Sequence, residues 1–302
     1  MPEGHTIHRL AGAFNSLFAG RAVETVSPQG RFTAGAELLS GRTIVRAQAW
    51  GKHLFVHFDD EFSHTLHVHL GLYGSWTFAG DGTIEVTEVI GAPRRRVGEG
   101  EVELAVVDES FPPPPRGQVR LRILEKHAVA DLTGPTTCAV RTVDEVQRVI
   151  ARLGPDPLHP DADAECFIVA LQRRRIPIAA ALMDQSVIAG VGNIYRAEAL
   201  FRAGVDPMKP SNVVSIEDAM AIWHDLVELM TDGVKVGRII TTKTSPHHSR
   251  FTAYLSQSLA PTGPFYVYQR TGLGCEVCAT PIAMTELAGR KLYWCPTCQS
   301  SS

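Results

Sequence analysis

Apolar residues recur at helical spacing close to the start of the chain. Ile7, Leu10, Phe14 and Leu17 fall on one face of a 3.6-residue repeat, and Gly20 follows as a stop signal. The pattern predicts an amphipathic helix that pins the amino terminus to its domain.

Short runs with period-two alternation follow this helix. They cover residues 43–49, 54–58, 64–70 and, further on, 119–123. Gly51-Lys52 is predicted to form the hairpin turn between the first two runs, and Gly71-Leu72-Tyr73-Gly74 ends the third. Short strands at this spacing predict a β-sandwich or barrel.

Alternation is lost between residues 80 and 117. Three arginines at 94–96, a Gly/Glu-rich run at 97–103 and four prolines at 112–115 predict an exposed excursion. The three arginines could contact nucleic acid, but a solvated loop is the favoured interpretation.

The apolar period becomes helical from Thr142. Thr142 and Glu145 have capping-box spacing ahead of apolar positions 146, 149, 150 and 153, and the sequence from Arg152 to Asp156 ends that helix. Further helices are predicted over 179–187, 193–202 and 216–230. A linker rich in Thr, Ser, His and Pro follows at 241–264. The predicted domains are residues 1–136, 142–240 and 264–302.

Composition is that of an ordinary globular protein, with 302 residues, 44% hydrophobic and 20% charged. No apolar run reaches the roughly 18 to 20 residues of a membrane span, and no signal-peptide pattern opens the chain, so a cytoplasmic protein without membrane contact is expected. The net charge of −3 does not indicate nucleic-acid binding. Residues 173–302 nevertheless carry 13 Lys+Arg against 10 Asp+Glu, which is compatible with a local DNA-binding face.

Four of the six cysteines form two Cys-x-x-Cys pairs, Cys275/Cys278 and Cys295/Cys298, separated by 16 residues. Four thiolates at this spacing predict one structural Zn²⁺ ion held by a hairpin, with no open position for catalysis. A segment of about 40 residues cannot bury enough core alone, so the metal should stabilise it. Cys138 and Cys166 have no partner pattern and are predicted to be buried small hydrophobes.

Two turns could bind phosphate. Arg290 lies at the basic tip between the cysteine pairs, where it is either a phosphate ligand or a solvated turn residue. The Gly190-Val191-Gly192-Asn193 turn separates two helical patterns, and Asn193 could cap the second helix. That turn is either a phosphate site at a helix amino terminus or a plain helical corner.

The chain opens with Met1-Pro2-Glu3. Removal of methionine would leave Pro2 as a secondary amine with a pKa of about 8, of which a larger share is uncharged at neutral pH than of a lysine. An uncharged amine forms Schiff bases with carbonyl-like carbons, and Glu3 is placed to exchange protons with the group that Pro2 attacks.

Taken together, these motifs resemble the formamidopyrimidine-DNA glycosylase/endonuclease VIII family of base-excision repair enzymes. The resemblance covers most of the chain and rests on six motifs in the same order: residues 1–5 (MPEGH), 51–54 (GKHL), 70–74 (LGLYG), 152–156 (RLGPD), 190–195 (GVGNIY) and 294–299 (WCPTCQ). It implies an α+β multidomain protein with an N-terminal β-sandwich and flanking helices, a helix–two-turn–helix domain and a C-terminal zinc-finger β-hairpin.

The resemblance also implies roles for individual residues. Pro2 resembles the family's Schiff-base nucleophile and Glu3 its acid/base. Lys52 matches the lysine that contacts phosphate and serves in β-elimination. Arg290 and Asn193 match residues that grip phosphates at the lesion, and Arg290 is also assigned to δ-elimination. The remaining positions implied to contact DNA are Gly71, Leu72, Tyr73, Arg152 and Gly190.

Two details favour the endonuclease VIII branch. Gly4 replaces the leucine typical of the purine-directed branch, and Leu72-Tyr73 resembles the wedge that fills the vacated base stack. Two residues depart from the pattern: Thr6 stands where many relatives carry glutamate, and Gly71 replaces a frequent glutamine. The expected function is a bifunctional DNA glycosylase/AP lyase acting on oxidised pyrimidines in damaged DNA, as a monomer associated with the nucleoid. The alternatives are oxidised-purine specificity and a catalytically silent zinc-finger DNA-binding protein.

Overall fold

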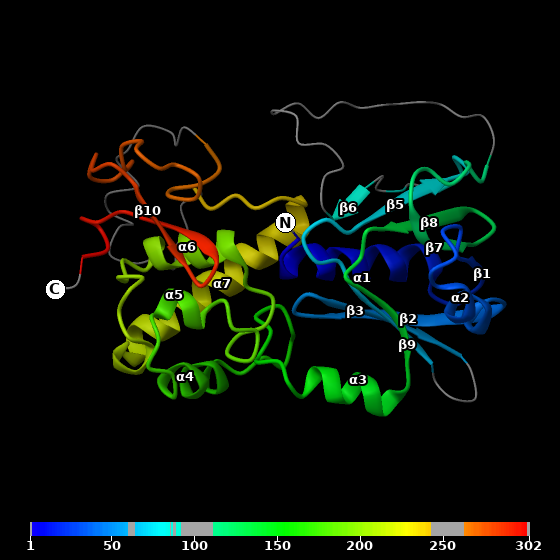
Figure 1. The fold of residues 1–302 in the computed structure, drawn as a ribbon, viewed down its shortest axis with the longest axis horizontal. Helices are drawn as coiled ribbons and strands as arrows, with labels where there is room; N and C mark the ends of the chain where they lie inside the picture. Colours follow the sequence, from blue (N-terminus) through cyan, green and yellow to red (C-terminus); the bar gives the residue numbers. More distant parts are fainter. Residues whose placement is uncertain are drawn as a thin grey trace. The chain divides into compact units, whose positions relative to one another are not determined.

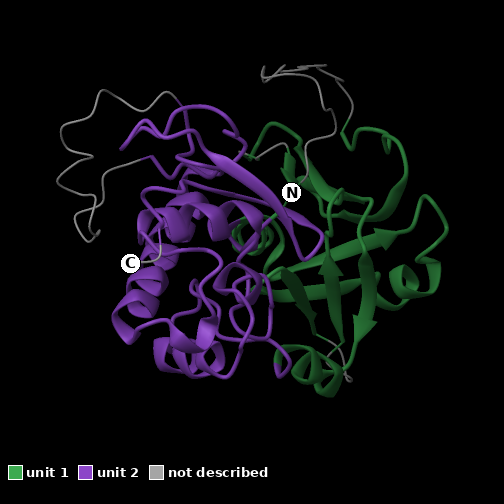
Figure 2. Cartoon of the chain, turned by 60° about the vertical axis from the view of Figure 1, so that its left-hand side comes forward, with its two compact units in different colours: residues 1–2, 6–150 green, residues 3–5, 151–302 purple. Residues whose placement is uncertain are grey.

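The computed structural model describes residues 2–59, 64–84, 86, 89–91, 111–242 and 263–300. The chain divides into two compact units, coloured separately in Figure 2. The first unit comprises residues 1–2 and 6–150, and the second comprises residues 3–5 and 151–302. The arginines predicted to lie in a loop at 94–96 and most of the predicted linker at 241–264 fall outside the described residues.

The first unit is an antiparallel sheet folded around a helix (Figure 1). Its elements in chain order are α1 (Gly4–Phe18), β1 (Arg21–Val26), α2 (Thr33–Leu39), β2 (Arg42–Trp50), β3 (His53–Phe58), β4 (Thr65–His69), β5 (Ser75–Gly80), β6 (Val89–Gly91), β7 (Val119–Leu124), β8 (Ala128–Thr133), β9 (Thr137–Arg141) and α3 (Val143–Ile150). The first two residues of α1 are assigned to the second unit.

Strand β1 joins the two layers of the sandwich. The sheet runs in the order β6-β5-β8-β7-β1-β2-β3-β4-β9. Residues 21–23 of β1 pair with β2, whereas residues 24–26 pair with β7. Helix α1 lies between the layers, with β2, β3 and β9 on one side and β5, β7 and β8 on the other in Figure 1. The predicted β-sandwich is therefore confirmed.

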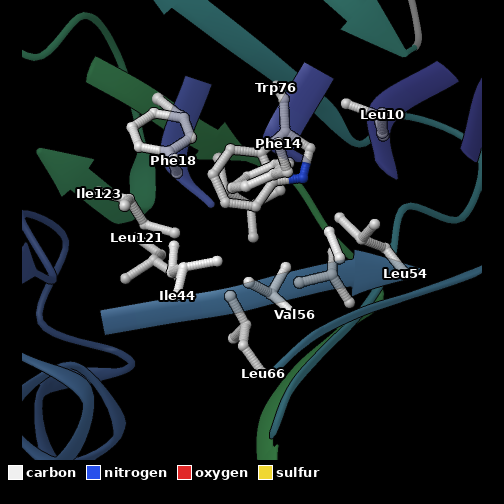
Figure 3. Packing of buried hydrophobic residues seen from close by; sticks show 14 of the residues in the cluster. Leu10, Phe14, Phe18, Ile44, Leu54, Val56, Leu66, Trp76, Leu121 and Ile123 are labelled. Carbon is white, nitrogen blue, oxygen red and sulfur yellow. The ribbon is translucent and has the colours of Figure 1, made fainter. Parts of the chain in front are cut away.

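The predicted apolar face of α1 forms the centre of this core. Figure 3 shows Phe14 beside Trp76, and their ring centroids are 4.8 Å apart in an edge-on arrangement. On the other side of the helix, the Asn15 amide exchanges two hydrogen bonds with the backbone of Ala47 in β2, at 2.9 and 2.7 Å. One hydrogen-bonded polar residue thus fixes the helix on a strand while its apolar face fills the interior.

Strand β3 is covered on both faces. Leu54 and Val56 point into the main core, whereas the fully buried Phe55 packs against Val146 and Val149 of α3. The predicted capping box begins α3, because the Thr142 N–H donates to the Glu145 carboxylate at 3.0 Å and the Glu145 N–H donates to Thr142 Oγ1 at 3.4 Å. Within the first unit α3 thus serves as the cover of β3.

The segment predicted as an exposed excursion contributes a strand where it is described. Residues 89–91 form β6, which pairs with β5 at the edge of the sheet. The prediction was therefore wrong for these three residues, because pairing with an existing edge strand needs little local sequence signal. Residues 92–110 lie outside the described part of the chain.

Buried and half-buried histidines line strands β3 and β4. His57 Nδ1 hydrogen-bonds with Thr65 Oγ1 at 2.9 Å, and His67 Nε2 hydrogen-bonds with His53 Nδ1 at 2.8 Å. Burial lowers the pKa of His57 to about 4, assisted by the charge of Arg46. Burial likewise lowers the pKa of His67 to about 4. Both side chains are therefore neutral in the folded protein at neutral pH.

We expect the melting temperature to fall as the pH is lowered from about 6.5 to about 4. In this window the unfolded chain binds a proton at each histidine, whose ordinary pKa is about 6.5, while the folded chain does not. Because the unfolded state then binds more protons, acid stabilises it. Thermal unfolding of His67→Gln across this range should show a smaller dependence on pH than the wild type, and an equal dependence would contradict the assignment.

The second unit combines helices with a C-terminal hairpin (Figure 1). Its elements are α4 (Ala164–Gln172), α5 (Ile178–Ala181), α6 (Asn193–Arg202), the 3₁₀ turn η1 (Ser211–Val213), α7 (Ile216–Val236), β10 (Ala283–Leu287) and β11 (Arg290–Trp294). The predicted helix at 216–230 is confirmed and continues to Val236. Ser215 caps its start by accepting the Asp218 N–H at 3.0 Å, and Gly237 ends it with φ +81°.

The helix predicted over 179–187 is wrong, since helix α5 has a single turn that ends at Ala181. The reason is competition from side chains. Asp184 accepts the backbone N–H and the hydroxyl of Ser186 at 2.9 and 2.7 Å, and Gln185 Oε1 accepts the Gly190 N–H at 3.0 Å. Polar side chains that bind nearby backbone in this way stop helix propagation.

Candidate active site

Glu3 forms the centre of the site in the second unit. Its side chain is fully buried, and its carboxylate accepts the N–H groups of Gly192 and Ile194 at 2.9 Å each and of Tyr195 at 3.5 Å. These donors are the first, otherwise unpaired N–H groups of α6. The partial positive charge at the start of a helix attracts a carboxylate placed there. Pro2, directly before Glu3, is also buried.

Glu3 takes the capping role that was predicted for Asn193. Helix α6 begins at Asn193, the residue at its N-cap position is Gly192, and Asn193 makes no side-chain capping bond. The prediction of a cap by Asn193 was therefore wrong. A carboxylate almost 200 positions earlier fills the site, and no local sequence pattern signals such a distant cap.

The glycines of the 190–193 turn are required by close packing. Gly190 has φ +88°, and its carbonyl accepts the Gly4 N–H at 2.8 Å. A Cβ atom at Gly4 would lie 2.8 Å from Gly190 Cα, and one at Gly192 would lie 2.4 Å from Glu3 Cδ. The backbone around Glu3 therefore leaves no room for a side chain at these positions, which gives Gly190 a structural role beside its predicted one.

The zinc-finger hairpin presents Arg290 at its tip. Leu287 and Arg290 are paired across a two-residue turn, in which Ala288 has φ +51° and Gly289 has φ +69°. Positive φ at both central residues is the turn that matches the twist of an antiparallel hairpin. Arg290 is half-buried and Lys291 is exposed, so this basic tip is placed at the start of β11.

Asn193 connects α6 to this hairpin. Its Nδ2 donates to the Lys291 carbonyl oxygen at 2.9 Å, and its Oδ1 accepts a hydrogen bond from Arg196. Burial raises the pKa of Tyr268, and a hydrogen bond between Tyr268 and the Asn193 side chain opposes this shift. Within the second unit, Glu3, Asn193 and the Arg290 hairpin are thus joined through the first turn of α6. The sequence analysis missed Arg196 and Tyr268, because neither lies in a pattern that marks chemistry.

A buried carboxylate anchors the segment that leads into the hairpin. Glu198 of α6 accepts the N–H groups of Tyr266 at 2.8 Å, Val267 at 2.9 Å and Tyr268 at 2.8 Å, and Thr241 Oγ1 also donates to it. Burial raises the pKa of Glu198, and these hydrogen bonds oppose that effect. The same helix that holds Glu3 at its start therefore fixes Tyr268 from its middle.

The four predicted zinc ligands come together. The Sγ atoms of Cys275, Cys278, Cys295 and Cys298 all lie within 4.8 Å of one another. A tetrahedral Zn–thiolate centre has Zn–S bonds of about 2.3 Å and therefore S–S separations of about 3.8 Å. The Cys275–Cys298 and Cys278–Cys295 Sγ separations are 3.9 and 3.4 Å. Burial raises the pKa of Cys275 to about 11, an effect that a bound dication reverses.

The other two cysteines differ from each other. Cys138 is half-buried against the core of the first unit, and burial raises the pKa of its thiol to about 12. Cys166 is exposed, so the prediction that it is a buried small hydrophobe was wrong. It lies in the first turn of α4, where its Sγ is 3.4 Å from an oxygen of the capping Asp163.

Lys52 and the predicted wedge belong to the first unit. Gly51 has φ +57° in the turn between β2 and β3, and Lys52 is half-buried beside it. Burial, with the charge of Lys52, lowers the pKa of His69. His69 Nδ1 also accepts the Gly71 N–H at 3.2 Å. His69 is therefore a common neighbour of the lysine turn and of the wedge loop.

The wedge loop presents two large apolar side chains. Gly71 has φ +67°, and a Cβ atom there would lie 1.9 Å from Thr136 Oγ1. The loop closes with a 3.0 Å hydrogen bond from the Gly74 N–H to the Leu70 carbonyl. Leu72 and Tyr73 are 44% and 74% exposed. Arg152, the last of the predicted DNA contacts, is exposed in the second unit.

Comparison with known proteins identifies the family. A Mycobacterium tuberculosis protein named Endonuclease 8 1 is 42% identical over 301 residues, which cover 99% of this chain and 100% of the relative. The chain belongs to the formamidopyrimidine-DNA glycosylase/endonuclease VIII family. Members of this family are DNA glycosylases with AP lyase activity, so the prediction of an enzyme of this class is confirmed.

Further matches to this family cover all three parts of the chain. The formamidopyrimidine-DNA glycosylase N-terminal domain matches residues 1–131, its H2TH domain matches residues 153–245, and the zinc finger found in FPG and IleRS matches residues 272–300. The formamidopyrimidine-DNA glycosylase of Methylococcus capsulatus is 29% identical over 267 residues, 87% of this chain and 84% of the relative.

Solved structures of the family share the fold. The Lactococcus lactis formamidopyrimidine-DNA glycosylase bound non-covalently to DNA containing an AP site has a TM-score of 0.73 at 20% identity, covering 99% of this chain and 100% of that chain. A complex with DNA containing carbocyclic 8-oxo-G has the same TM-score. In the described parts of the present family member, no helix combines the length and apolar character needed to cross a membrane.

Proposed function

We propose that this protein excises oxidised pyrimidines from damaged DNA and cleaves the strand at the resulting abasic site, with Pro2 and Glu3 as its catalytic pair. The observation that carries the proposal is the buried Glu3 carboxylate, which three backbone N–H groups hold at the start of α6. A carboxylate so fixed, one residue from Pro2, is suited to proton transfer.

The proposed reaction begins at Pro2. Once Met1 is removed, the secondary amine attacks C1′ of the damaged nucleotide and the C1′–N bond to the base breaks, so that the base leaves as an anion and takes a proton from solvent. Glu3 accepts the proton that the Pro2 nitrogen gives up and delivers it to the sugar ring oxygen, so that the C1′–O4′ bond breaks and the ring opens. The product is an iminium ion between Pro2 and C1′ of the sugar. This positive centre acidifies the C2′–H bond, so that loss of the C2′ proton expels the 3′ phosphate.

The other site residues bind the DNA backbone. Lys52 contacts phosphate and assists β-elimination, and Arg290 grips phosphate and assists δ-elimination. Asn193 and Arg152 complete the phosphate contacts, and Gly190 presents backbone to the strand. The solved family members bind DNA that contains an AP site or a damaged base, which supports damaged DNA as the ligand. We further propose that the protein works as a monomer at the nucleoid.

Leu72 and Tyr73 form the proposed wedge. A base inside a duplex cannot be reached by the site, so the nucleotide must be flipped out. The exposed side chains of Leu72 and Tyr73 are of the apolar and aromatic kind that fills a vacated base stack. Gly71 supplies the left-handed turn beneath them. Loss of the wedge would penalise excision from duplexes more than from single strands.

Four thiolates support a single structural Zn²⁺ ion. Cys275, Cys278, Cys295 and Cys298 would hold it, leaving no position for water or substrate. When bound, the ion supplies no chemistry to the reaction. Its proposed effect is to fold the hairpin that carries Arg290.

Borohydride trapping on abasic DNA tests the enzymatic mechanism. The full-length protein, with its mature amino terminus verified by mass spectrometry, is expected to form a covalent complex that is lost when Pro2 is acetylated. Failure to trap, with DNA binding retained, would favour the silent DNA-binding alternative.

Substrate choice is tested by comparing excision of thymine glycol and 8-oxoguanine from matched duplexes. Gly4 and the Leu72-Tyr73 wedge support the pyrimidine, and the identity of 42% to Endonuclease 8 1 agrees with that branch. A strong preference for 8-oxoguanine would overturn the pyrimidine assignment and leave the lyase mechanism unaffected.

Gly192→Ala is expected to lower single-turnover excision by about 10- to 100-fold, because a Cβ there would lie 2.4 Å from Glu3 Cδ and displace the carboxylate. Zinc content should stay unchanged. The matched control is Gly12→Ala in α1, where nothing lies within 4 Å and alanine favours the helix. Equal excision rates for the two variants would contradict the packing argument.

A further inference from the structure

A buried cation, Arg196, adjoins the proposed site and has no role in the mechanism above. Arg196 lies in the first turns of α6, and its side chain is 0% exposed. Its Nη1 donates to the Ala179 carbonyl at 3.3 Å, and its Nη2 donates both to the Lys291 carbonyl at 3.1 Å and to Asn193 Oδ1. Its Nε has no hydrogen-bond partner among the described residues.

The hydrogen-bond partners of Arg196 differ from those of Arg202, which lies on the same helix. Arg202 is also buried, and its guanidinium pairs directly with the Asp225 carboxylate at 2.9 Å. The hydrogen bonds of Arg196 instead go to two carbonyls and an amide. Burial lowers its pKa to about 10, while the charge of Glu3 raises the pKa and that of Arg290 lowers it. Arg196 is therefore still charged at neutral pH.

The partners of Arg196 are the residues that the site needs to have in place. The Asn193 amide is fixed at both ends, because Oδ1 accepts from Arg196 and Nδ2 donates to the Lys291 carbonyl at 2.9 Å. Asn193 and Arg196, both on α6, thus donate to the same carbonyl oxygen, that of Lys291. Lys291 directly follows Arg290 in the hairpin. Removing Arg196 would take away the donor to Asn193 Oδ1 and one of the two hydrogen bonds from Asn193 and Arg196 to the Lys291 carbonyl.

We propose that Arg196 is a positioning residue that holds the Asn193 amide and the Arg290–Lys291 edge of the zinc hairpin in the arrangement that grips a DNA phosphate near Glu3. The inference rests on the proposed function and names a residue that acts through others. Arg196 acts without contacting DNA itself, because its guanidinium already donates to Ala179, Asn193 and Lys291. Its positive charge adds to the attraction for a phosphate, since charges interact strongly in a poorly solvated interior.

The test is a binding titration on the full-length, zinc-loaded protein. The probe is a fluorescein-labelled duplex with a tetrahydrofuran abasic analogue, followed by anisotropy over a series of salt concentrations. Arg196→Lys, which keeps the charge and loses the planar fork, is expected to weaken binding by about 10- to 100-fold. The slope of log K against log salt should fall in magnitude by about 1, as for the loss of one phosphate contact.

Two comparisons separate positioning from general damage. Arg202→Lys removes an equally buried fork from α6 and should change affinity by less than about threefold at equal folded fraction and leave the salt slope as in the wild type. On an Asn193→Ala background, Arg196→Lys should cause little further loss, because the two residues act as a unit. Should Arg196→Lys not fold, Arg196→Gln, which keeps an N–H donor for the Lys291 carbonyl, is judged by the same criteria.

Wild-type affinity and salt slope in the folded Arg196 variant would overturn the proposal, as would a full, additive loss on the Asn193→Ala background. Borohydride trapping reports separately on the proposed function. If the wild type failed to trap while its binding still depended on Arg196, the lyase mechanism would be rejected and the positioning role would stand.

Discussion

Glu3→Gln is expected to slow release of the damaged base by about 10²- to 10⁴-fold at saturating DNA, the range that a positioned proton donor contributes. The substitution keeps the size of the side chain but abolishes its ability to exchange a proton. In the variant an NH₂ group also faces the backbone N–H groups of Gly192, Ile194 and Tyr195. In the wild type these groups donate hydrogen bonds to the Glu3 carboxylate. The loss of an acceptor among these donors makes the effect larger than the loss of the proton alone.

Single-turnover excision, with anisotropy binding to a tetrahydrofuran duplex, measures this prediction. Affinity should change by less than about threefold, because Glu3 is fully buried. The matched control is Glu145→Gln, which alters another carboxylate that accepts a backbone N–H at a helix start, outside the proposed site. A comparable loss of excision in both variants would show that capping, and not proton transfer, is what Glu3 contributes.

Removal of zinc is expected to weaken binding of abasic DNA by about 10²-fold or more, because the tip that carries Arg290 and Lys291 loses its fold and several phosphate contacts are lost together. A hairpin of this size has too small a core to fold without a staple. Asn193 and Arg196 would also lose their common acceptor, the Lys291 carbonyl.

Cys295→Ser tests the same point without a chelator. The side chain of Cys295 is fully buried within the thiol cluster, whereas that of Cys166 is exposed and lies outside the cluster. Zinc content, thermal unfolding and DNA affinity should all fall in Cys295→Ser and remain normal in Cys166→Ser. Retention of wild-type affinity by metal-free protein would contradict the proposed role of the hairpin.

Sequence patterns predicted those features whose causes are local. The helical repeat of Ile7 to Phe18, the capping box of Thr142 and Glu145, and the two cysteine pairs each carry their own structural reason within a few residues. The same holds for the strand alternation of β2, β3 and β4. For this reason a β-sandwich or barrel and the metal-binding cluster could be predicted from local patterns, whereas the complete fold class was implied by the family resemblance.

The prediction errors arose where the local structure depends on contacts that the helical or strand pattern of the sequence does not show. The cap of α6 comes from Glu3, and a prediction restricted to residues 190–195 selected Asn193 instead. The short α5 ends because Asp184 and Gln185 satisfy nearby backbone groups, which an apolar repeat does not reveal. Arg196 was not singled out, since only the three-dimensional structure shows that its side chain is enclosed and directed at the hairpin.

The long sequence separation between Glu3 and its three backbone donors has a consequence for synthesis on the ribosome. The residue that should handle the proton is made among the first, and the amides that immobilise it emerge only after nearly two-thirds of the chain has been translated. A polypeptide arrested earlier carries Pro2 and Glu3 without their support, and one arrested before Cys298 also lacks a complete metal cage. Termination products that lack these segments are thus expected to be inert toward DNA.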